Sequence, residues 1–394
     1  MPDLEHFSIL GKLNAADFLA EYWQKKPLLI QSAIPNYISP VSADELAGLA
    51  CSDDVESRIV LEKDGTSPWE LRHGPFDEET FGHLPASHWT LLVQECNKHV
   101  PDLAVLLEQF NFIPNWRVDD VMVSYAAPHG SVGPHVDQYD VFLLQGMGQR
   151  RWQITSNKSE HLTFIPGTDL RILEQFEAEQ EWVLGPGDML YLPPGVAHYG
   201  VALDDCLTLS VGFRAPSHYE LLTHFAEDQF SNITDPFLIP RYEDPKLTLT
   251  ENCGEITGSA LEKIIDTIQS YAGNTENIKR WFGRYITEPK NDSDDLSEED
   301  PYSVDQLREI LTSQDYVCRS EYARFSFIKN PNDTSYLYVN GHEHLLESTA
   351  QLFAPAICNQ RRIDTCAMLS LINSPECEDL VVKFFNSGYL YFEK

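Results

Sequence analysis

Apolar residues recur at two different periods along this chain, and the change of period divides it into regions. Between about residues 116 and 214, short apolar runs with strand character are separated by glycine and proline. This spacing is typical of antiparallel strands in a closed barrel or jelly roll. We therefore predict strands at Val121–Tyr125, Val141–Leu144, Arg150–Ile154, Glu181–Leu184, Met189–Leu192 and Leu207–Phe213.

The N-terminal region shows mostly helical spacing. A helix is predicted from residue 13 to about Pro27, followed by a strand that reaches residue 30. A second helix begins after Ser42, which forms a capping box with Glu45. Residues 57–72 predict a hairpin around Asp64–Gly65. Residues 87–110 predict a third helix with one apolar face: Trp89, Leu92, Val93, Cys96 and Val100.

Beyond residue 216 the apolar spacing becomes helical again. Helices are predicted at 219–230, at 259–273 with a capping box of Ser259 and Glu262, and at 277–286. An acidic, turn-rich linker follows at 288–301. The last part, 302–394, predicts a winged-helix-like module with helices near 303–312, 347–358 and 362–373 and strands near 323–329, 334–340 and 388–392.

The charge of the chain is strongly negative. Its 394 residues include 61 acidic and 28 basic side chains, for a net charge of −33. Such a surface repels nucleic-acid phosphates and attracts basic partners, so we expect no direct DNA or RNA binding and favour a basic polypeptide as partner. Solubility, or adaptation to salt or cold, explains the same acidity equally well.

Cysteine usage and hydropathy bear on the compartment. The eight cysteines are scattered singly without a Cys-x-x-Cys pair, which predicts neither a zinc site nor a disulfide framework. No apolar run reaches the length of a membrane span, and the N-terminus lacks the basic and apolar segments of a secretory signal. We expect a soluble protein of the reducing cytoplasm, not bound to a membrane.

The segment His135-Val136-Asp137, together with His198, carries the candidate chemistry. Alternate residues of a strand share a face, so His135 and Asp137 are expected to point the same way. Two imidazoles and one carboxylate form the facial triad of non-haem iron oxygenases. A lone His-x-Asp is more often a surface pair. The metal interpretation rests on its combination with His198, which follows the Gly185–Gly195 segment typical of jelly-roll barrels.

An iron oxygenase also needs a reducing co-substrate, commonly 2-oxoglutarate, whose far carboxylate requires a cation. Arg150 and Arg151 are the candidates, because a guanidinium matches a carboxylate in bidentate geometry. Alternation places Arg150 and Trp152 on one face of a strand and Arg151 on the other, without saying which face is inward. Ser124 is a possible hydroxyl partner, and an ordinary strand serine is an equally good interpretation.

Other polar and aromatic residues near the motif have open roles. Asp140 could attract a cationic substrate or brace a ligand histidine, and Tyr139 could stack on a substrate or simply pack, with Gln138 beside them. Tyr191 and Tyr199 are expected to line the barrel.

Four strings of this chain resemble the JmjC-type bacterial ribosomal oxygenases. They are Gly133–Phe142, Gly148–Trp152, Gly185–Gly195 and Ser210–Pro216, and the likeness extends over nearly the whole chain. Within that family the chain is most similar to the arginine 3-hydroxylases that act on protein 16 of the large ribosomal subunit. One departure is visible: the family pattern has three successive arginines where this chain has Gln149-Arg150-Arg151.

The resemblance implies an α+β fold: a JmjC double-stranded β-helix (a cupin-like jelly roll) with an N-terminal extension over 1–215, a helical dimerisation region over 216–287 and a winged-helix domain. The barrel core itself covers about 90–215. It implies Fe(II) held by His135, Asp137 and His198, and 2-oxoglutarate held by Arg150 and Ser124. It also implies a homodimer that hydroxylates an arginine β-carbon in a basic ribosomal protein.

Three alternatives remain open from the sequence. The same scaffold could hydroxylate histidine or lysine, or remove methyl groups. A non-redox cupin usually has a second histidine where Asp137 stands. A non-catalytic ribosome-associated binding protein would need neither the triad nor Arg150, so the presence of both argues against it.

Overall fold

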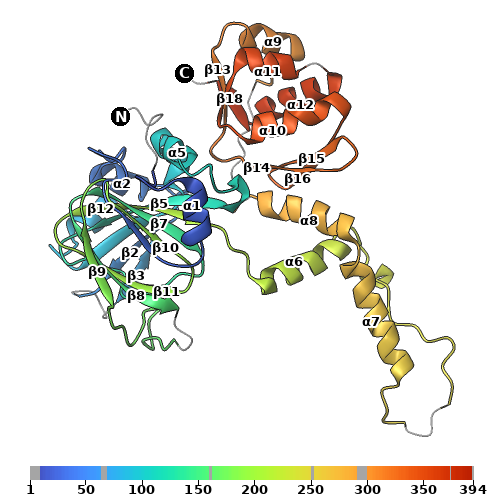
Figure 1. The fold of residues 1–394 in the computed structure, drawn as a ribbon, viewed down its shortest axis with the longest axis horizontal. Coiled ribbons are helices and arrows are strands. Elements are labelled where there is room, and N and C mark those ends of the chain that lie inside the picture. Colours follow the sequence, from blue (N-terminus) through green and yellow to red (C-terminus); the bar gives the residue numbers. More distant parts are fainter. Residues whose placement is uncertain are drawn as a thin grey trace. The chain divides into compact units, whose positions relative to one another are not determined.

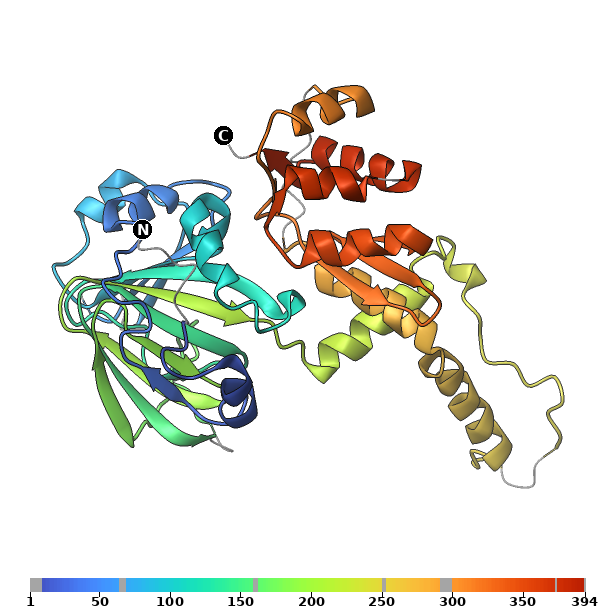
Figure 2. The same cartoon turned by 45° about the horizontal axis from the view of Figure 1, so that its top comes forward.

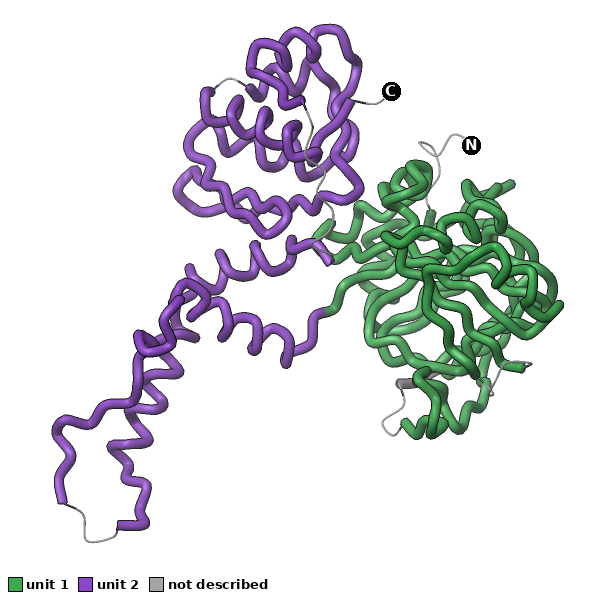
Figure 3. Tube along the Cα trace, turned by 180° about the vertical axis from the view of Figure 1, so that it is seen from behind, with its two compact units in different colours: residues 1–215 green, residues 216–394 purple. Residues whose placement is uncertain are grey.

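The chain folds into two units, residues 1–215 and 216–394, shown in green and purple in Figure 3. The computed structural model describes residues 9–63, 69–158, 162–249, 253–290, 300–372 and 374–392. Most of the acidic linker predicted at 288–301 lies outside these ranges, as does the Asp64–Gly65 turn, so both stay predictions.

The first unit contains a barrel of two antiparallel sheets (Figure 1). The larger, eight-stranded sheet runs in the order β1 (Leu28–Ile30), β10 (Met189–Leu192), β7 (Asp140–Met147), β12 (Cys206–Phe213), β5 (Val118–Ala126), β4 (Trp89–Val93), β2 (Ser57–Leu61) and β3 (Glu70–His73). The smaller, four-stranded sheet is β6 (His135–Val136), β11 (Val196–Ala202), β8 (Arg150–Lys158) and β9 (Gln180–Leu184). The predicted jelly roll is confirmed, and β6 lies where His135 was expected on a strand, whereas β11 is a strand that the sequence had not indicated.

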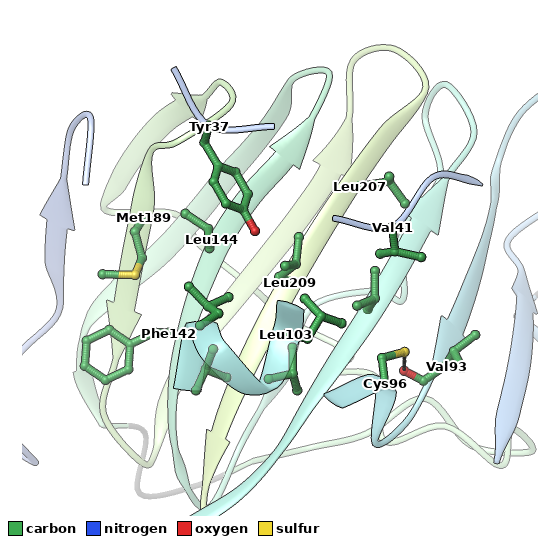
Figure 4. Packing of buried hydrophobic residues seen from close by; sticks show 14 of the residues in the cluster. Tyr37, Val41, Val93, Cys96, Leu103, Phe142, Leu144, Met189, Leu207 and Leu209 are labelled. Carbon is green, nitrogen blue, oxygen red and sulfur yellow. Dashed lines mark hydrogen bonds between the residues drawn. The ribbon is translucent and has the colours of Figure 1, made fainter. Parts of the chain in front are cut away.

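A first core lies between the larger sheet and the segments that cover its outer face. Helices α1 (Ala15–Glu21), α2 (Ala43–Leu49), α4 (Cys96–His99) and α5 (Pro101–Glu108) contribute to it, while the short helices α3 (Glu78–Gly82) and η2 (Asn115–Arg117) lie nearby. Figure 4 shows Leu103 of α5 on the same side of the sheet as Leu144 and Leu209. Phe18 of α1 is fully buried and meets the Tyr191 ring edge-on at 4.9 Å.

The prediction that Tyr191 lines the barrel is therefore wrong, because its side chain faces this outer core. The reason is alternation along β10, whose Leu190 and Leu192 take the inward positions. The inner core consists of apolar side chains from both sheets: Val141, Leu143, Trp152, Ile154, Leu184, Leu190, Leu192 and Val196.

The helix predicted over 87–110 is wrong in its first part. Residues Trp89–Val93 form β4, which pairs with β2 and β5, and helix begins only at Cys96. A short apolar run satisfies both the helical and the strand period, and here the pairing partners decide the outcome. The Ser42–Glu45 capping box of α2 is present as predicted.

The second unit begins with three helices, α6 (His218–Phe230), α7 (Gly258–Ala272) and α8 (Thr275–Thr287). Figure 2 shows α7 extending away from α6 and α8. Its N-cap is Thr257, whose side chain accepts a hydrogen bond from the Ala260 amide, so the predicted Ser259 cap is wrong by two residues. The predicted end at Gly273 is confirmed.

The C-terminal module has two three-stranded sheets: β17 (Arg362–Asp364), β13 (Tyr316–Arg319) and β18 (Leu390–Phe392), and β14 (Phe325–Lys329), β15 (Thr334–Val339) and β16 (His342–Glu347). Its helices are α9 (Val304–Leu311), α10 (Phe353–Cys358), α11 (Thr365–Leu371) and α12 (Pro375–Asn386). They share one apolar core. Of these elements, β13, β16, β17 and α12 had not been predicted.

Helix α8 packs directly on the sheet β14–β15–β16. A β-carbon at Gly283 would lie 2.2 Å from the Tyr338 ring, so the helix approaches the sheet as closely as glycine allows. Arg280 donates to Glu343 of β16 at 2.7 Å, and Arg284 pairs with Asp228 of α6 at 2.7 Å. Helix α8 is thus tied both to the winged-helix sheet and to α6. Among the described residues, no helix is both long and apolar enough to cross a bilayer.

Candidate metal and co-substrate site

His135, Asp137 and His198 form the one cluster of potential metal ligands found among the described residues. One donor atom from each lies within 4.8 Å of the other two. Asp137 Oδ1 is 3.8 Å from His135 Nε2, and its Oδ2 is 3.6 Å from His198 Nε2. One carboxylate therefore faces both imidazoles, the arrangement that a facial triad requires.

The smaller sheet brings these three residues together. His135 on β6 is the register partner of His198 on β11, and the two rings lie 4.2 Å apart. The Asp137 carbonyl accepts a hydrogen bond of 2.8 Å from the Gly195 amide, which fixes the loop after β6 against the turn before β11. The site thus rests on backbone pairing, which gives a metal site its precision.

Both histidines are oriented by their own backbone. His135 Nδ1 lies 2.9 Å from the Gly133 carbonyl, and His198 Nδ1 lies 3.1 Å from the Val196 carbonyl. A proton on each Nδ1 leaves the Nε2 lone pair directed at the cluster. Burial lowers the pKa of His198 to about 4, and the nearby His135 contributes in the same direction. His198 is thus a neutral imidazole at neutral pH, the form that binds metal.

Arg150 lies behind His198 in the barrel interior with only 2% of its surface exposed. Its guanidinium donates to Ser124 Oγ at 3.5 Å and to the Gly200 carbonyl at 3.3 Å, while Nε has no hydrogen-bond partner in the described part of the chain. No carboxylate among the described residues pairs with it. A buried guanidinium without an anion is unfavourable, so this position is suited to an anionic ligand.

Small and polar side chains surround that guanidinium. Ala126, Ala202 and Cys206 pack together beside it. The Thr208 hydroxyl donates to Gln145 Oε1 at 3.2 Å, and Ser124 Oγ donates to the Thr208 carbonyl at 3.5 Å. The interior next to Arg150 is therefore lined by small side chains and hydrogen-bonding groups. These residues fit the far carboxylate of a dicarboxylate whose other end reaches the metal cluster.

Strand alternation separates the two candidate arginines. Arg150 and Trp152 are buried on the inward face of β8, whereas Arg151 is only partly buried and takes the other face. The structure thus brings His135, Asp137, His198, Arg150 and Ser124 to one interior and leaves Arg151 outside it.

Asp140, one of the open candidates, belongs to a different part of the fold. Its carboxylate accepts hydrogen bonds from Tyr191 at 2.7 Å, Gln24 at 3.0 Å and Arg117 at 3.2 Å. These contacts anchor the N-terminal extension to β7, so Asp140 neither braces a ligand histidine nor faces the cluster. Because its carboxylate is already occupied by these three partners, Asp140 cannot serve as the counterion of a cationic substrate.

Tyr139, two residues after Asp137, lies near two aspartates of β5, Asp119 and Asp120. Tyr139 is 43% exposed. Desolvation is the main cause that raises the pKa of Tyr139, and the carboxylates of Asp137, Asp120 and Asp119 raise it further. On β5, Asp120 lies on the same face as Ser124 by alternation. Sequence reasoning missed Asp120, although its place four residues before Ser124 on one strand was a usable signal.

Comparisons with known proteins agree with this arrangement. Residues 105–221 match the JmjC domain, and residues 266–391 match the ROXA-like winged helix. The chain is 34% identical over 387 residues to the ribosomal protein uL16 3-hydroxylase of Escherichia coli K12, covering 97% of this chain and 98% of that protein. It is 40% identical over 235 residues to a probable ribosomal oxygenase of Haemophilus influenzae, covering 59% of this chain and 55% of that protein.

Solved structures give the same result. The X-ray structure of E. coli ycfD superposes with a TM-score of 0.85 at 33% identity, covering 97% of this chain and 99% of that one. A structure of that ribosomal oxygenase in complex with cobalt and 2-oxoglutarate superposes with a TM-score of 0.82 at 33% identity, with the same coverage.

Proposed function

Because this chain belongs to the family of JmjC ribosomal oxygenases, we propose that it hydroxylates the β-carbon of an arginine in large-subunit ribosomal protein uL16. The reaction consumes dioxygen and 2-oxoglutarate and depends on Fe(II). The observation that carries the proposal is the buried Arg150, which has no carboxylate partner among the described residues and lies beside a cluster of two imidazoles and a carboxylate.

In this proposal His135, Asp137 and His198 hold the metal. Iron, when bound there, supplies the chemistry that couples decarboxylation of 2-oxoglutarate to insertion of one oxygen atom of dioxygen into a C–H bond. The neutral state of His198 keeps its Nε2 free for the metal. The backbone carbonyls at Nδ1 hold both rings in the required orientation.

Arg150 and Ser124 bind the far carboxylate of 2-oxoglutarate. The guanidinium lies within 3.5 Å of Ser124 Oγ, so one anion can accept hydrogen bonds from both groups once the hydroxyl rotates away from the Thr208 carbonyl. Burial excludes water from this pair, which strengthens the interaction with an anion. The near end of the co-substrate is thereby directed towards the metal cluster.

We further propose that Asp120 and Tyr139 receive the substrate arginine. Around Tyr139 the carboxylates of Asp137, Asp120 and Asp119 outnumber one guanidinium, that of Arg58, so this side of the site is negative and suits a guanidinium. Asp120→Asn should raise the KM for a uL16 peptide, with Asp53→Asn on an exposed loop as control. An unchanged KM would move substrate recognition away from β5.

We propose that a second copy of this chain covers the apolar stripe of α7. Leu261, Ile264, Ile265 and Ile268 recur at helical spacing on that helix, and between 44% and 63% of each side chain is exposed. The net charge of −33 makes two copies repel each other, so association requires an uncharged surface such as this one. A stripe on each copy matches itself about a twofold axis.

Location and partners follow from the proposed substrate. A basic ribosomal protein is drawn to an acidic surface, and we infer that the enzyme acts in the cytoplasm without binding nucleic acid directly. We also propose that residues 1–215 form the oxygenase domain, 216–287 the dimerisation region, 288–301 a linker and 302–394 the winged-helix domain.

Incubation of the protein with Fe(II), 2-oxoglutarate, air and a uL16 peptide tests the function. The proposal expects gain of one oxygen on a single arginine. Succinate without peptide oxidation would instead indicate another target, such as a histidine or lysine. If neither succinate nor oxidised peptide is formed, the result would favour a binding protein without catalysis.

A further inference from the structure

Gly200 lies on β11 directly opposite Trp152 of β8. A β-carbon at this position would lie 2.6 and 2.7 Å from Cζ3 and Cη2 of the Trp152 indole and 2.8 Å from Nε of Arg150. Real β-carbons do not approach other atoms so closely, so any larger residue here must displace one or both side chains.

Those two side chains have little room to move. The Arg150 guanidinium lies over the Trp152 ring, 5.0 Å from its centroid, and the centroid of the His198 ring lies 5.9 Å from that of Trp152. Trp152 is 4% exposed and belongs to the inner core of the barrel. Closely packed interiors resist added volume, so the strain of a new methyl group passes to Arg150.

The Gly200 backbone also contacts the same group. Its carbonyl accepts a hydrogen bond of 3.3 Å from Nη2 of Arg150, while Nη1 donates to Ser124 Oγ. The guanidinium is thus held by the Gly200 carbonyl, by Ser124 and by the face of the indole, and the missing β-carbon of Gly200 leaves the space in which Nε and the indole meet.

We propose that Gly200 is a positioning residue for the co-substrate: its lack of a side chain seats Arg150 and Trp152 so that the guanidinium faces the far carboxylate of 2-oxoglutarate. This inference rests on the proposed function. Arg150 and Ser124 contact the co-substrate directly. Gly200 is a third residue that determines its affinity, but it does so without touching the co-substrate.

Equilibrium binding of 2-oxoglutarate to the anaerobic Mn(II)-loaded full chain tests this role. Gly200→Ala should weaken 2-oxoglutarate binding about 10- to 100-fold, the range expected for loss of one or two charge-assisted hydrogen bonds. The Kd for Mn(II) alone should stay within about threefold of wild type, since the β6–β11 pairing that holds the ligands is unchanged. An unchanged Kd for 2-oxoglutarate would overturn the inference.

Gly146 provides a matched control. It is also a strand glycine, on β7, and an added β-carbon would lie 2.6 Å from Leu209 Cδ1 in the outer core. Gly146→Ala should lower thermal stability while leaving the Kd for 2-oxoglutarate unchanged. A comparable loss of affinity in this variant would mean that general destabilisation, not seating of Arg150, explains the effect.

A second substitution separates crowding from misfolding. In Gly200→Ala combined with Trp152→Phe, the ring loses Cζ3 and Cη2, which the new methyl group meets, and Arg150 Nε can shift into the space they leave. The affinity for 2-oxoglutarate should therefore recover to within about threefold of Trp152→Phe alone. A folded double variant without recovery would refute the mechanism even if Gly200→Ala alone fails to fold. Failure of wild type to bind 2-oxoglutarate would instead contradict the proposed function.

Discussion

His135 and His198 are register partners across the antiparallel pair of β6 and β11, and their rings lie 4.2 Å apart. Two segments distant in sequence are thereby fixed by backbone hydrogen bonds at the point where the metal ligands meet. Asp137 completes the cluster from the loop that follows β6. The site is built into the sheet, so its ligands can be replaced singly without removing the strands that carry them.

Replacing His135 with alanine should abolish metal binding and turnover while leaving the fold intact. The side chain is only partly buried, and its backbone pairing with His198 does not depend on the imidazole. We expect turnover to fall by about 100-fold or more, since two remaining ligands cannot hold the metal in an open octahedral site. Metal analysis and circular dichroism provide the measurements.

His83→Ala is the matched control, because His83 is exposed at the end of α3 and belongs to no cluster of potential metal ligands among the described residues. It should retain metal and activity. Full turnover in His135→Ala would refute the metal assignment.

Removing the guanidinium of Arg150 should raise the KM for 2-oxoglutarate by about 10- to 100-fold, because a buried anion loses its charge-assisted hydrogen bonds. Arg150→Lys should restore the positive charge but not the bidentate geometry, so its KM should lie between those of wild type and the variant without the cation. Arg151→Ala, on the opposite face of β8, is the control. Initial rates at varied 2-oxoglutarate decide the matter, and a larger effect in Arg151→Ala would exchange the two roles.

Aspartates placed on α7 should separate a dimer into monomers. Ile264→Asp with Ile268→Asp puts charge into the apolar stripe, where burial in an interface would cost more than the contact returns. Ser270→Asp adds one negative charge on the opposite face of the helix and should leave the dimer intact. Light scattering after size-exclusion chromatography measures the mass. A monomeric wild type, or a double variant that stays dimeric, would contradict the proposed interface.

His344 of β16 should make the second unit less stable at acidic pH. Burial lowers its pKa to about 4, with Lys383 and His342 acting in the same direction, while it packs 5.6 Å from the Phe384 ring. Because its pKa in the unfolded chain is near 6.5, the unfolded state binds the extra proton between these values. The stabilisation is therefore present above about pH 6.5 and is lost as the pH falls towards 4.

The loss should be on the order of 1–3 kcal/mol, reduced by the partial exposure of the ring. Denaturant unfolding of wild type and His344→Gln across this range isolates it from the carboxylates that titrate nearby. Parallel pH profiles for the two proteins would show that His344 makes no such contribution.

The local motifs of the site could be predicted from sequence, because each lies within a few residues. His135, Asp137 and the alternation of Arg150 with Arg151 are examples. Strand β11 escaped prediction, since its histidine and glycine give it little strand character alone. Pairing with β6 and β8 makes it a strand. Asp120 was missed although it shares a face of β5 with Ser124, because its nearness to Tyr139 depends on the folded barrel.

Other errors came from ambiguous or neglected signals. The apolar run Trp89–Val93 satisfies two periods, and only its partners β2 and β5 identify it as a strand. Helix α12 was predictable, because Ser374 caps it and Pro375 occupies its first turn. The closeness of Gly200 to Trp152 was not, since it depends on the register of two strands.

The most direct test of the central claim is tandem mass spectrometry of uL16 after reaction with the Fe(II)-loaded protein, 2-oxoglutarate and air, with succinate measured in the same sample. We predict one added oxygen on the β-carbon of a single arginine, formed in step with succinate and absent when 2-oxoglutarate is omitted. Unmodified uL16 in a sample where the protein is loaded with metal and 2-oxoglutarate is consumed would contradict the account.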